Sequence, residues 1–290
     1  MESQVLLGDC LEVMKDISDE SIDMILCDLP YGTTNCRWDV IIPFEPLWQH
    51  YQRVVKKNGA IVLTASQPFT SVLVASNLKD YRYSWVWEKS KATGYLNSKR
   101  MPMKAHEDIC IFYRKLPTYN PQMVAGTPYD KGKAHRPTSV YGAQGQKRNT
   151  RRRKDLMRLE EKELHALLEK NSLSVTGTKE EKVERYINLL NPIEVHVKNM
   201  TGLRYPRTVQ YFKTAESEGK VYHPTQKPLS LFEYLIRTYT HEEEVVLDNC
   251  VGSGTTALAA LNTNRKYVCI EKDEKYYNIT NQRISERIEK

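Results

Sequence analysis

The stretch that decides the fold is Asp248 to Thr256, which reads DNCVGSGTT. An apolar run from Glu244 to Leu247 predicts a strand before it. A helix is expected after it, and a second predicted strand over Lys266 to Ile270 ends at Glu271. This order of strand, glycine turn, helix and strand, with an acid 19 residues after Gly252, is the layout of a nucleotide-binding βαβ unit. A purely structural turn is the alternative interpretation.

The position of this unit near the end of the chain restricts the topology. Only 19 residues follow Glu271, too few for the remaining strands of a doubly wound sheet, so those strands must come from earlier in the chain. We therefore expect a circularly permuted order, in which a strand tip at Asp28 lies beside the strand tip at Asp248. A carboxylate at Asp248 suits a ligand that carries a sulfonium cation better than NAD, which carries a pyrophosphate.

The first half of the chain has the pattern of an α/β domain. Ser21 to Cys27 (SIDMILC) is a near-continuous apolar run, typical of a strand buried on both faces of a parallel sheet. A helix is expected to end at Asn58-Gly59, before a second buried strand over Ala60 to Thr64. Further strands are predicted over 81–87, where alternate Tyr and Trp side chains share one face, and over 107–113.

Composition favours a polyanionic partner and a reducing compartment. The 290 residues include 43 Lys and Arg against 36 Asp and Glu, a formal net charge of +7. The six cysteines form no CxxC pair, and no run of 18 apolar residues occurs, so we expect a cytoplasmic protein without a membrane span. His106 and His223 lack neighbours at metal-ligand spacing, and no metal is predicted.

The tetrapeptide Asp28-Leu29-Pro30-Tyr31 follows the first buried strand and can be given a chemical role. The exocyclic amine of adenine is a poor nucleophile because its lone pair is delocalised into the ring. The Asp28 carboxylate and the Leu29 carbonyl could accept its two N–H bonds and so let the nitrogen become tetrahedral. Pro30 restricts Leu29 to an extended conformation, and Tyr31 offers a ring on which a base can stack. The alternative is a strand that ends in a simple Pro-Tyr turn.

These segments together resemble the DNA amino-methyltransferases. The signature D/N/S-P-P-Y/F of that family corresponds to DLPY at Asp28, and here it precedes the glycine loop, as in the permuted group of the family. Gly8-Asp9-Cys10 matches the family element near the adenine of the cofactor, and His223 to Pro228 (HPTQKP) matches the element near its methionine end. The resemblance implies a Rossmann-like α/β core, S-adenosylmethionine as cofactor, no metal, and a base flipped out of the duplex.

Two departures from the family pattern leave the implied chemistry intact. Leu29 replaces the usual first proline, but the mechanism requires only its backbone carbonyl, and Cys250 replaces a frequent phenylalanine. The resemblance implies adenine N6 as the target, because an aspartate in first place is typical of adenine enzymes, whereas serine is more usual for cytosine N4. The predicted catalytic residues are Asp28, Leu29, Pro30 and Tyr31; the predicted cofactor contacts are Asp9, Cys10, Asp28, Lys227, Asp248, Asn249, Cys250, Gly252, Ser253, Gly254, Thr255, Thr256 and Glu271.

The middle of the chain differs from both ends in composition. We assign residues 1–115 and 220–290 to the methyltransferase core and residues 116–219 to an inserted target-recognition region. Within it, 155–192 predicts two short helices, at about 160–170 and 179–190, and resembles a SAP module, a DNA-binding helical hairpin with a G-T-K turn. A solvated helical hairpin is the alternative.

Double-stranded DNA is the expected partner. The predicted DNA contacts are basic residues of the run before the hairpin and of its second helix: Lys147, Arg148, Arg151, Arg152, Arg153, Lys154 and Lys179. The resemblance is compatible with a homodimer and with a restriction endonuclease partner. Cytosine N4, an RNA amine or a protein glutamine amine is an alternative target, and a catalytically silent DNA-binding regulator is the alternative from another class.

Overall fold

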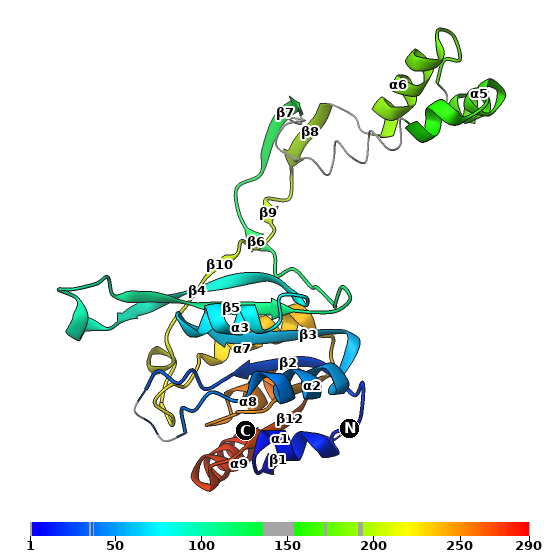
Figure 1. Ribbon diagram of the computed structural model, residues 1–290. Coiled ribbons are helices and arrows are strands. Elements are labelled where there is room, and N and C mark those ends of the chain that lie inside the picture. Colours follow the sequence, from blue (N-terminus) through cyan, green and yellow to red (C-terminus); the bar gives the residue numbers. More distant parts are fainter. Residues whose placement is uncertain are drawn as a thin grey trace. The chain divides into compact units, whose positions relative to one another are not determined.

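The computed structural model describes residues 2–34, 36, 38–135, 154–170, 173–190 and 194–289, and the chain forms two compact units (Figure 1). The first unit contains residues 1–123 and 205–290, and the second contains residues 124–204.

The first unit is built on one eight-stranded sheet. In spatial order its strands are β1 (Gln4–Leu7), β12 (Lys266–Glu271), β11 (Val245–Asp248), β2 (Ile22–Asp28), β3 (Val55–Ala65), β5 (Lys104–Phe112), β4 (Tyr81–Thr93) and β10 (Val209–Phe212). The five strands from β1 to β3 are parallel to their neighbours, β5 is antiparallel to β3 and β4, and β10 is parallel to β4. The pairing of β10 with β4 explains why residues 205–219, which we assigned to the inserted region, lie in this unit.

Helices cover both faces of the sheet, as expected of an α/β core (Figure 1). One face packs against α1 (Cys10–Val13), the 3-10 turn η1 (Met14–Asp16), α2 (Phe44–Val54) and α3 (Phe69–Ser76), and the other against α7 (Leu229–Tyr239), α8 (Thr255–Asn262) and α9 (Glu274–Ile288).

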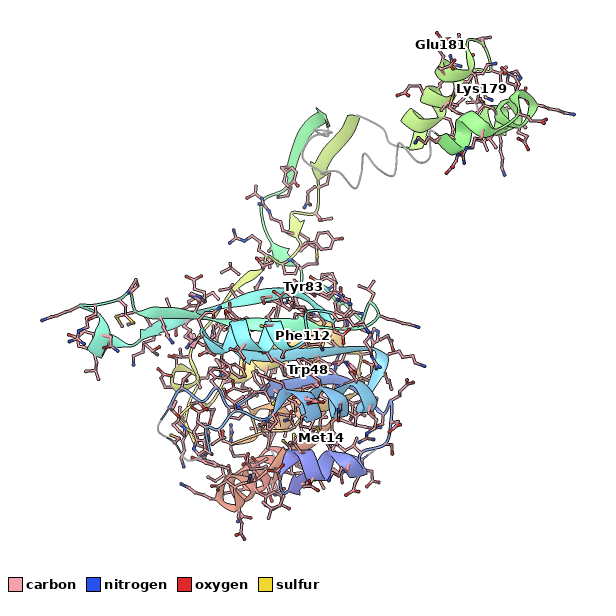
Figure 2. All side chains as sticks on the ribbon, in the orientation of Figure 1. Met14, Trp48, Tyr83, Phe112, Lys179 and Glu181 are labelled. Carbon is pink, nitrogen blue, oxygen red and sulfur yellow. The ribbon has the colours of Figure 1, made fainter. Side chains whose placement is uncertain are left out.

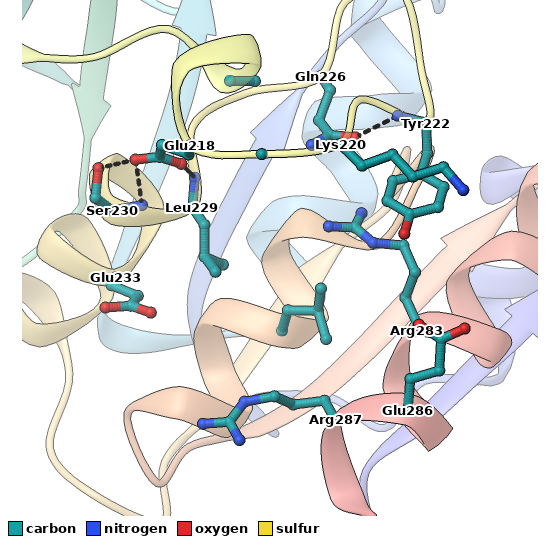
Figure 3. A pocket seen from close by; sticks show the side chains of 13 residues that line it. Glu218, Lys220, Tyr222, Gln226, Leu229, Ser230, Glu233, Arg283, Glu286 and Arg287 are labelled. Carbon is teal, nitrogen blue, oxygen red and sulfur yellow. Dashed lines mark hydrogen bonds between the residues drawn. The ribbon is translucent and has the colours of Figure 1, made fainter. Parts of the chain in front are cut away.

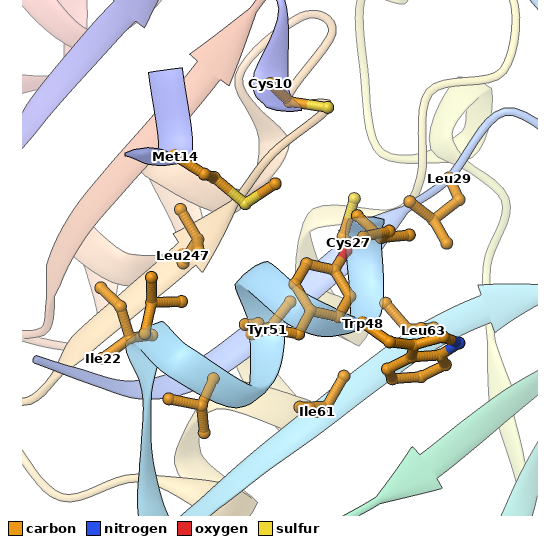
Figure 4. Packing of buried hydrophobic residues seen from close by; sticks show 14 of the residues in the cluster. Cys10, Met14, Ile22, Cys27, Leu29, Trp48, Tyr51, Ile61, Leu63 and Leu247 are labelled. Carbon is orange, nitrogen blue, oxygen red and sulfur yellow. The ribbon is translucent and has the colours of Figure 1, made fainter. Parts of the chain in front are cut away.

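Strand β2 shows why both faces are apolar. Ile25 and Cys27 belong to the first cluster and Met24 and Leu26 to the second, and all four are fully buried. Figures 2 and 4 show the first cluster, with Met14 among its members.

Two local expectations about strands are wrong. Asn58-Gly59 does not end a helix: α2 ends at Val54, and β3 runs through both residues with an irregular register opposite β2. Gly59 is needed there because a Cβ atom would lie 2.7 Å from the Asp23 carbonyl oxygen. Tyr81 does not share a face with the Tyr and Trp residues that follow it, because the β4–β5 register shifts between Tyr81 and Tyr83 and places Tyr81 in the first cluster.

The second unit contains two short antiparallel pairs and a helical hairpin. The pairs are β6 (Val124–Ala125) with β9 (Leu203–Arg204) and β7 (Tyr129–His135) with β8 (Glu194–Asn199). The two predicted helices are confirmed as α5 (Glu161–Lys170) and α6 (Lys179–Leu190). Leu164, Leu168 and Val183 form their small core.

A capping box begins α6 in the predicted G-T-K turn. Glu181 N donates to Thr178 Oγ1 at 3.2 Å and Thr178 N donates to Glu181 Oε2 at 2.9 Å, so each residue satisfies a backbone donor of the other. Gly177, with φ +98°, supplies the left-handed conformation before the cap. These contacts account for the hairpin, and its likeness to a SAP module stays a prediction.

Candidate active site

The two predicted motif segments meet at one edge of the central sheet. β2 and β11 are parallel neighbours, with Met24 opposite Val246 and Ile25 opposite Leu247. They end at Asp28 and Asp248, and parallel neighbours end at the same edge. The chain turns toward β3 after β2 and toward β12 after β11, which makes this edge the topological switch point of the sheet. The predicted convergence of the two segments is confirmed.

Three side chains hold the Asp28 carboxylate. Tyr31 Oη donates to Oδ1 at 2.7 Å, and Thr64 Oγ1, from the facing position of β3, donates to the same oxygen at 2.5 Å. Lys227 Nζ donates to Oδ2 at 2.5 Å. The carboxylate is therefore fixed in orientation by groups from three separate segments, which is the preorganisation that a catalytic acceptor needs.

The Tyr31 ring is fixed as firmly as its hydroxyl. It stacks on Phe69, the first residue of α3, with ring centroids 4.9 Å apart and planes 21° apart. Lys227 Nζ lies 5.5 Å from the ring centroid. Burial and the charge of Asp28 raise the pKa of Tyr31, so its hydroxyl remains a donor.

Lys227 belongs to a buried chain of alternating charges. Its ammonium lies 2.5 Å from Asp28 Oδ2 and 3.5 Å from Glu107 Oε2, and Lys89 Nζ lies 2.5 Å from Glu107 Oε1. Burial alone would lower the pKa of Lys227, but the carboxylates of Asp28 and Glu107 outweigh it and hold the pKa above its ordinary value. Burial alone would raise the pKa of Glu107, but Lys227 and Lys89 hold it below its ordinary value. Glu107 and Lys227 are thus both charged at neutral pH.

The glycine loop after β11 is shaped by contacts with two carboxylates. Gly252 and Gly254 have φ of +56° and +87°, which side chains rarely adopt, and a Cβ atom on Gly254 would lie 2.9 Å from the Thr280 side chain. Gly252 N donates to Glu271 Oε2 at 2.7 Å. Thr256 Oγ1 and the Cys250 backbone N–H both donate to the carboxylate of Asp248.

Burial makes both of these carboxyl groups less acidic. It raises the pKa of Asp248 to about 6, and it also raises the pKa of Glu271. Ionising either group is therefore costly, and a cation bound beside them would lower that cost.

Asp9 lies just after β1, the strand that pairs with β12. Its carboxylate caps α1 by accepting from Leu11 N at 3.0 Å, and its other oxygen accepts from Lys272 Nζ at 2.9 Å. The hydrogen bond with Lys272 lowers the pKa of Asp9. The Gly8 N–H donates to the Glu271 carbonyl at 2.9 Å. This hydrogen bond brings the predicted GD element beside Glu271, another predicted cofactor contact.

Two predicted cofactor residues point into the protein interior. Asn249 is 2% exposed, and its side-chain oxygen accepts from Tyr51 Oη at 2.5 Å. Cys10 is 7% exposed and belongs to the hydrophobic cluster beneath α1 and α2.

The HPTQKP segment is fastened to the glycine loop. Ser253 Oγ donates to Gln226 Oε1 at 2.9 Å, and the His223 ring packs against the rings of Trp38 and Tyr276 at 4.8 and 4.4 Å. The same segment supplies Lys227 to Asp28, so it links the two motifs.

A pocket of 410 Å³ is lined by Gln226 and other residues preceding α7, and by residues of helices α7, α8 and α9 (Figure 3). There Arg283 donates to the Ser253 carbonyl and packs over the Tyr222 ring, 4.6 Å from its centroid. None of the four DLPY residues lines this pocket, so it is separate from the Asp28 cluster.

Sequence reasoning missed Thr64, Phe69, Lys89 and Glu107. Thr64 and Glu107 lie in segments that were predicted as strands, and a charged residue such as Glu107 in an apolar strand was a usable signal. Trp85 and Trp87, on the predicted strand over 81–87, are 4% and 3% exposed and belong to the core.

A second missed feature is the hairpin arm, residues 90–104, which joins β4 to β5 and projects from the rest of its unit (Figure 1). Its sequence contains no Asp or Glu. Its exposed basic, aromatic and large apolar residues are Lys91, Tyr95, Leu96, Lys99, Arg100, Met101, Met103 and Lys104.

The predicted DNA contacts are only partly described. Lys147, Arg148, Arg151, Arg152 and Arg153 lie outside the described residues. Lys154 is exposed, and Lys179 donates from its ammonium to the Leu159 carbonyl at 2.6 Å, within the helical hairpin.

Within the described ranges, no group of three or more His, Cys, Asp and Glu side chains is arranged to hold a metal ion. No helix in the described part of the chain has both the length and the apolar character needed to cross a membrane.

The chain is similar in sequence and in fold to known DNA methyltransferases. A relative is the type II methyltransferase M.HindIII of Haemophilus influenzae, 50% identical over 68 residues, which are 23% of this chain and only 22% of that protein. The solved structure of an M1.HpyAVI–SAM complex has 20% identity and a TM-score of 0.57, and the match covers 97% of this chain and 98% of that one. The cytosine-N4-specific PvuII DNA methyltransferase has 12% identity and a TM-score of 0.57, over 100% of this chain and 92% of that one.

These structural likenesses confirm the predicted methyltransferase-like α/β fold. The family N6_N4_Mtase, described as DNA methylase, matches residues 22–282. Because that match spans most of the chain, including both Asp28 and the glycine loop, the protein belongs to the DNA methylase family.

Proposed function

We propose that this protein transfers a methyl group from S-adenosylmethionine to the N6 amine of an adenine in double-stranded DNA. The observation that carries the proposal is the adjacency of β2 and β11, which brings a fixed carboxylate, Asp28, and a ligand-binding glycine loop to one edge of the sheet. The motif order along the chain supports assignment to the permuted group of the family.

The residues at this edge fit the cofactor. Gly252 leaves room for close approach of a ligand, Glu271 can accept from ribose hydroxyls, and Asp248 and Asp9 add negative charge. When bound, S-adenosylmethionine supplies an electrophilic methyl group on a sulfonium cation. The cost of ionising buried Asp248 favours a cationic ligand over a neutral or anionic one.

Asp28 and Leu29 orient the amine, and Pro30 holds Leu29 extended. The carboxylate of Asp28 accepts one N–H of the base, the Leu29 carbonyl accepts the other, and Tyr31 supports the base by stacking. Tyr31 and Thr64, which both donate to Asp28 Oδ1, keep the carboxylate in one orientation while the amine becomes tetrahedral. No covalent intermediate is required.

Adenine N6 is favoured by the aspartate at position 28, and cytosine N4 is the second candidate. The PvuII enzyme, which is cytosine-N4-specific, has the same fold as this chain with a TM-score of 0.57. That likeness is the observation in favour of cytosine N4.

DNA binding is assigned to three basic elements. The hairpin arm combines cations with exposed Tyr95 and Leu96, a composition that suits phosphate contacts and base stacking. The other two elements are the run from Lys147 to Lys154 and the SAP-like hairpin, which both lie within the proposed target-recognition region, 116–219. A cytoplasmic location, a homodimer and a restriction endonuclease partner remain predictions.

Substitution of Asp28 tests the proposed mechanism. In single-turnover methylation with labelled cofactor, Asp28→Ala should be slower by a factor of about 100 to 1000, by analogy with loss of one preorganised polar contact. Cofactor affinity should largely persist. Asp108→Asn is the matched control, since Asp108 lies on β5 and accepts only from Thr70 among the contacts found for its side chain in the described chain. Near-normal turnover by Asp28→Ala would remove Asp28 from its role, and DNA binding without any turnover by the unmodified protein would favour a silent regulator.

A further inference from the structure

The Asp28 carboxylate has little acceptor capacity left for a substrate. A carboxylate oxygen accepts about two hydrogen bonds. Oδ1 already accepts from Tyr31 and Thr64, so the base amine must use Oδ2. That oxygen is held at 2.5 Å by the Lys227 ammonium. By the same count Oδ2 has one acceptor site left, so the amine would have to share this oxygen with a buried cation.

Glu107 offers the same cation a second place. Its Oε2 lies 3.5 Å from Lys227 Nζ, is buried, and has no hydrogen-bond partner in the described part of the protein. Its other oxygen is occupied by Lys89 at 2.5 Å. A buried carboxylate oxygen without a donor is unfavourable, so a small movement of Lys227 would satisfy it.

Charge balance makes this movement inexpensive. The two carboxylates of Asp28 and Glu107 balance the two ammonium groups of Lys89 and Lys227, and the side chains of both lysines are less than a tenth exposed. Moving Lys227 from Asp28 to Glu107 exchanges one charged hydrogen bond for another and leaves the net charge of the cluster at zero.

We propose that Glu107 is a positioning residue that receives the Lys227 ammonium when the base amine enters, and so frees Asp28 Oδ2 to accept the amine. The inference rests on the proposed function and adds a substrate-gated exchange to it. Before the amine arrives, Lys227 occupies Oδ2 and keeps the buried carboxylate paired. Afterwards Lys227 pairs with Glu107, and the amine takes its place.

The alternative is that Glu107 only neutralises two buried lysines. The two accounts differ in what removal of Lys227 does once Glu107 is neutral. In Glu107→Gln, one oxygen becomes an NH2 donor that cannot accept an ammonium, and the remaining oxygen is taken by Lys89, so Lys227 stays on Asp28. Deleting Lys227 in that background then removes the competitor of the amine.

The experiment compares single-turnover rates at saturating S-adenosylmethionine and DNA. Glu107→Gln should be slower than the unmodified protein by about 10- to 100-fold, the range for loss of a hydrogen bond to a charged group. The double variant E107Q/K227M should be faster than E107Q, by several-fold. Lys227→Met and Asp108→Asn are measured as references, and cofactor affinity of each variant is measured separately.

A double variant no faster than E107Q, or an E107Q rate equal to that of the unmodified protein, would overturn the inference while leaving the role of Asp28 intact. Near-normal activity of Asp28→Ala would instead contradict the proposed function. If E107Q does not fold, Lys89→Met is combined with it to restore neutrality, and the rescue by Lys227→Met is sought in that background, with the same two outcomes.

Discussion

Asp248 allows a quantitative test of the electrostatics at the sheet edge. Its carboxyl group is 2% exposed, and burial raises its pKa from 3.8 to about 6. The folded protein therefore holds this proton more tightly than the unfolded chain does. Below about pH 4 the group is neutral in both states and costs nothing. As pH rises from 4 to 6, its ionisation in the unfolded chain favours unfolding.

The shift of about two units corresponds to about 3 kcal/mol, and about half of this develops between pH 5 and pH 7.5. Asp248→Asn removes the ionisation but keeps an oxygen for the Cys250 N–H and an amide for Thr256 Oγ1. We therefore expect the variant to gain stability relative to the unmodified protein as pH rises, by about 1.5 kcal/mol between these two pH values.

Urea unfolding followed by tryptophan fluorescence measures this difference. All four tryptophans, Trp38, Trp48, Trp85 and Trp87, lie in the first compact unit, so the signal reports the unit that contains Asp248. A difference in unfolding free energy that is the same at pH 5 and pH 7.5 would refute the reasoning, because it would show that Asp248 ionises in the fold as readily as in the unfolded chain.

Two further predictions address DNA binding and the second unit. The double substitution of Lys99 and Arg100 to Ala should reduce the slope of log affinity for DNA against log salt by about 2, since each phosphate contact contributes about 0.9. The control is Lys266→Ala, at the amino-terminal end of β12, which should leave the slope unchanged. If the double variant and the unmodified protein have equal slopes, the hairpin arm is not a phosphate contact. Leu168→Ala should lower the stability of the α5–α6 helical hairpin by about 2 to 5 kcal/mol and make the hairpin more sensitive to protease. The unfolding transition of the first unit, followed by tryptophan fluorescence, should not change. Protease resistance equal to that of the unmodified protein would contradict the packing of Leu168 in this core.

The sequence predicts the elements of the core because their signals are local. The apolar run of β2 and the glycine loop after β11 each identify their own strand, and chain length then requires the two to be neighbours. Residues that interrupt the apolar pattern of a strand were harder to place. Gly59 has the signature of a turn, but it lies inside β3 because only a glycine fits beside the Asp23 carbonyl, a contact with another strand that no local pattern contains.

The charge chain at Asp28 could not be predicted for the same reason. Lys89, Glu107, Lys227 and Asp28 come from four separate segments, and no local pattern pairs them with one another. Their pairing depends on the order of strands β2, β3, β5 and β4 and on the path of the segment before α7. Strand β10 was missed because its four residues, VQYF, are too few to show a period.

The most direct test of the account is mass spectrometry of nucleosides from duplex DNA incubated with the protein and S-adenosylmethionine labelled in its methyl group. We expect labelled N6-methyladenine, and far less of it in the same time when Asp28→Ala replaces the unmodified protein. Labelled N4-methylcytosine would correct the target base and keep the site. No labelled nucleoside at all, from a folded protein that binds the cofactor, would contradict the claim that the sheet edge between Asp28 and Asp248 is a methyl-transfer site for DNA.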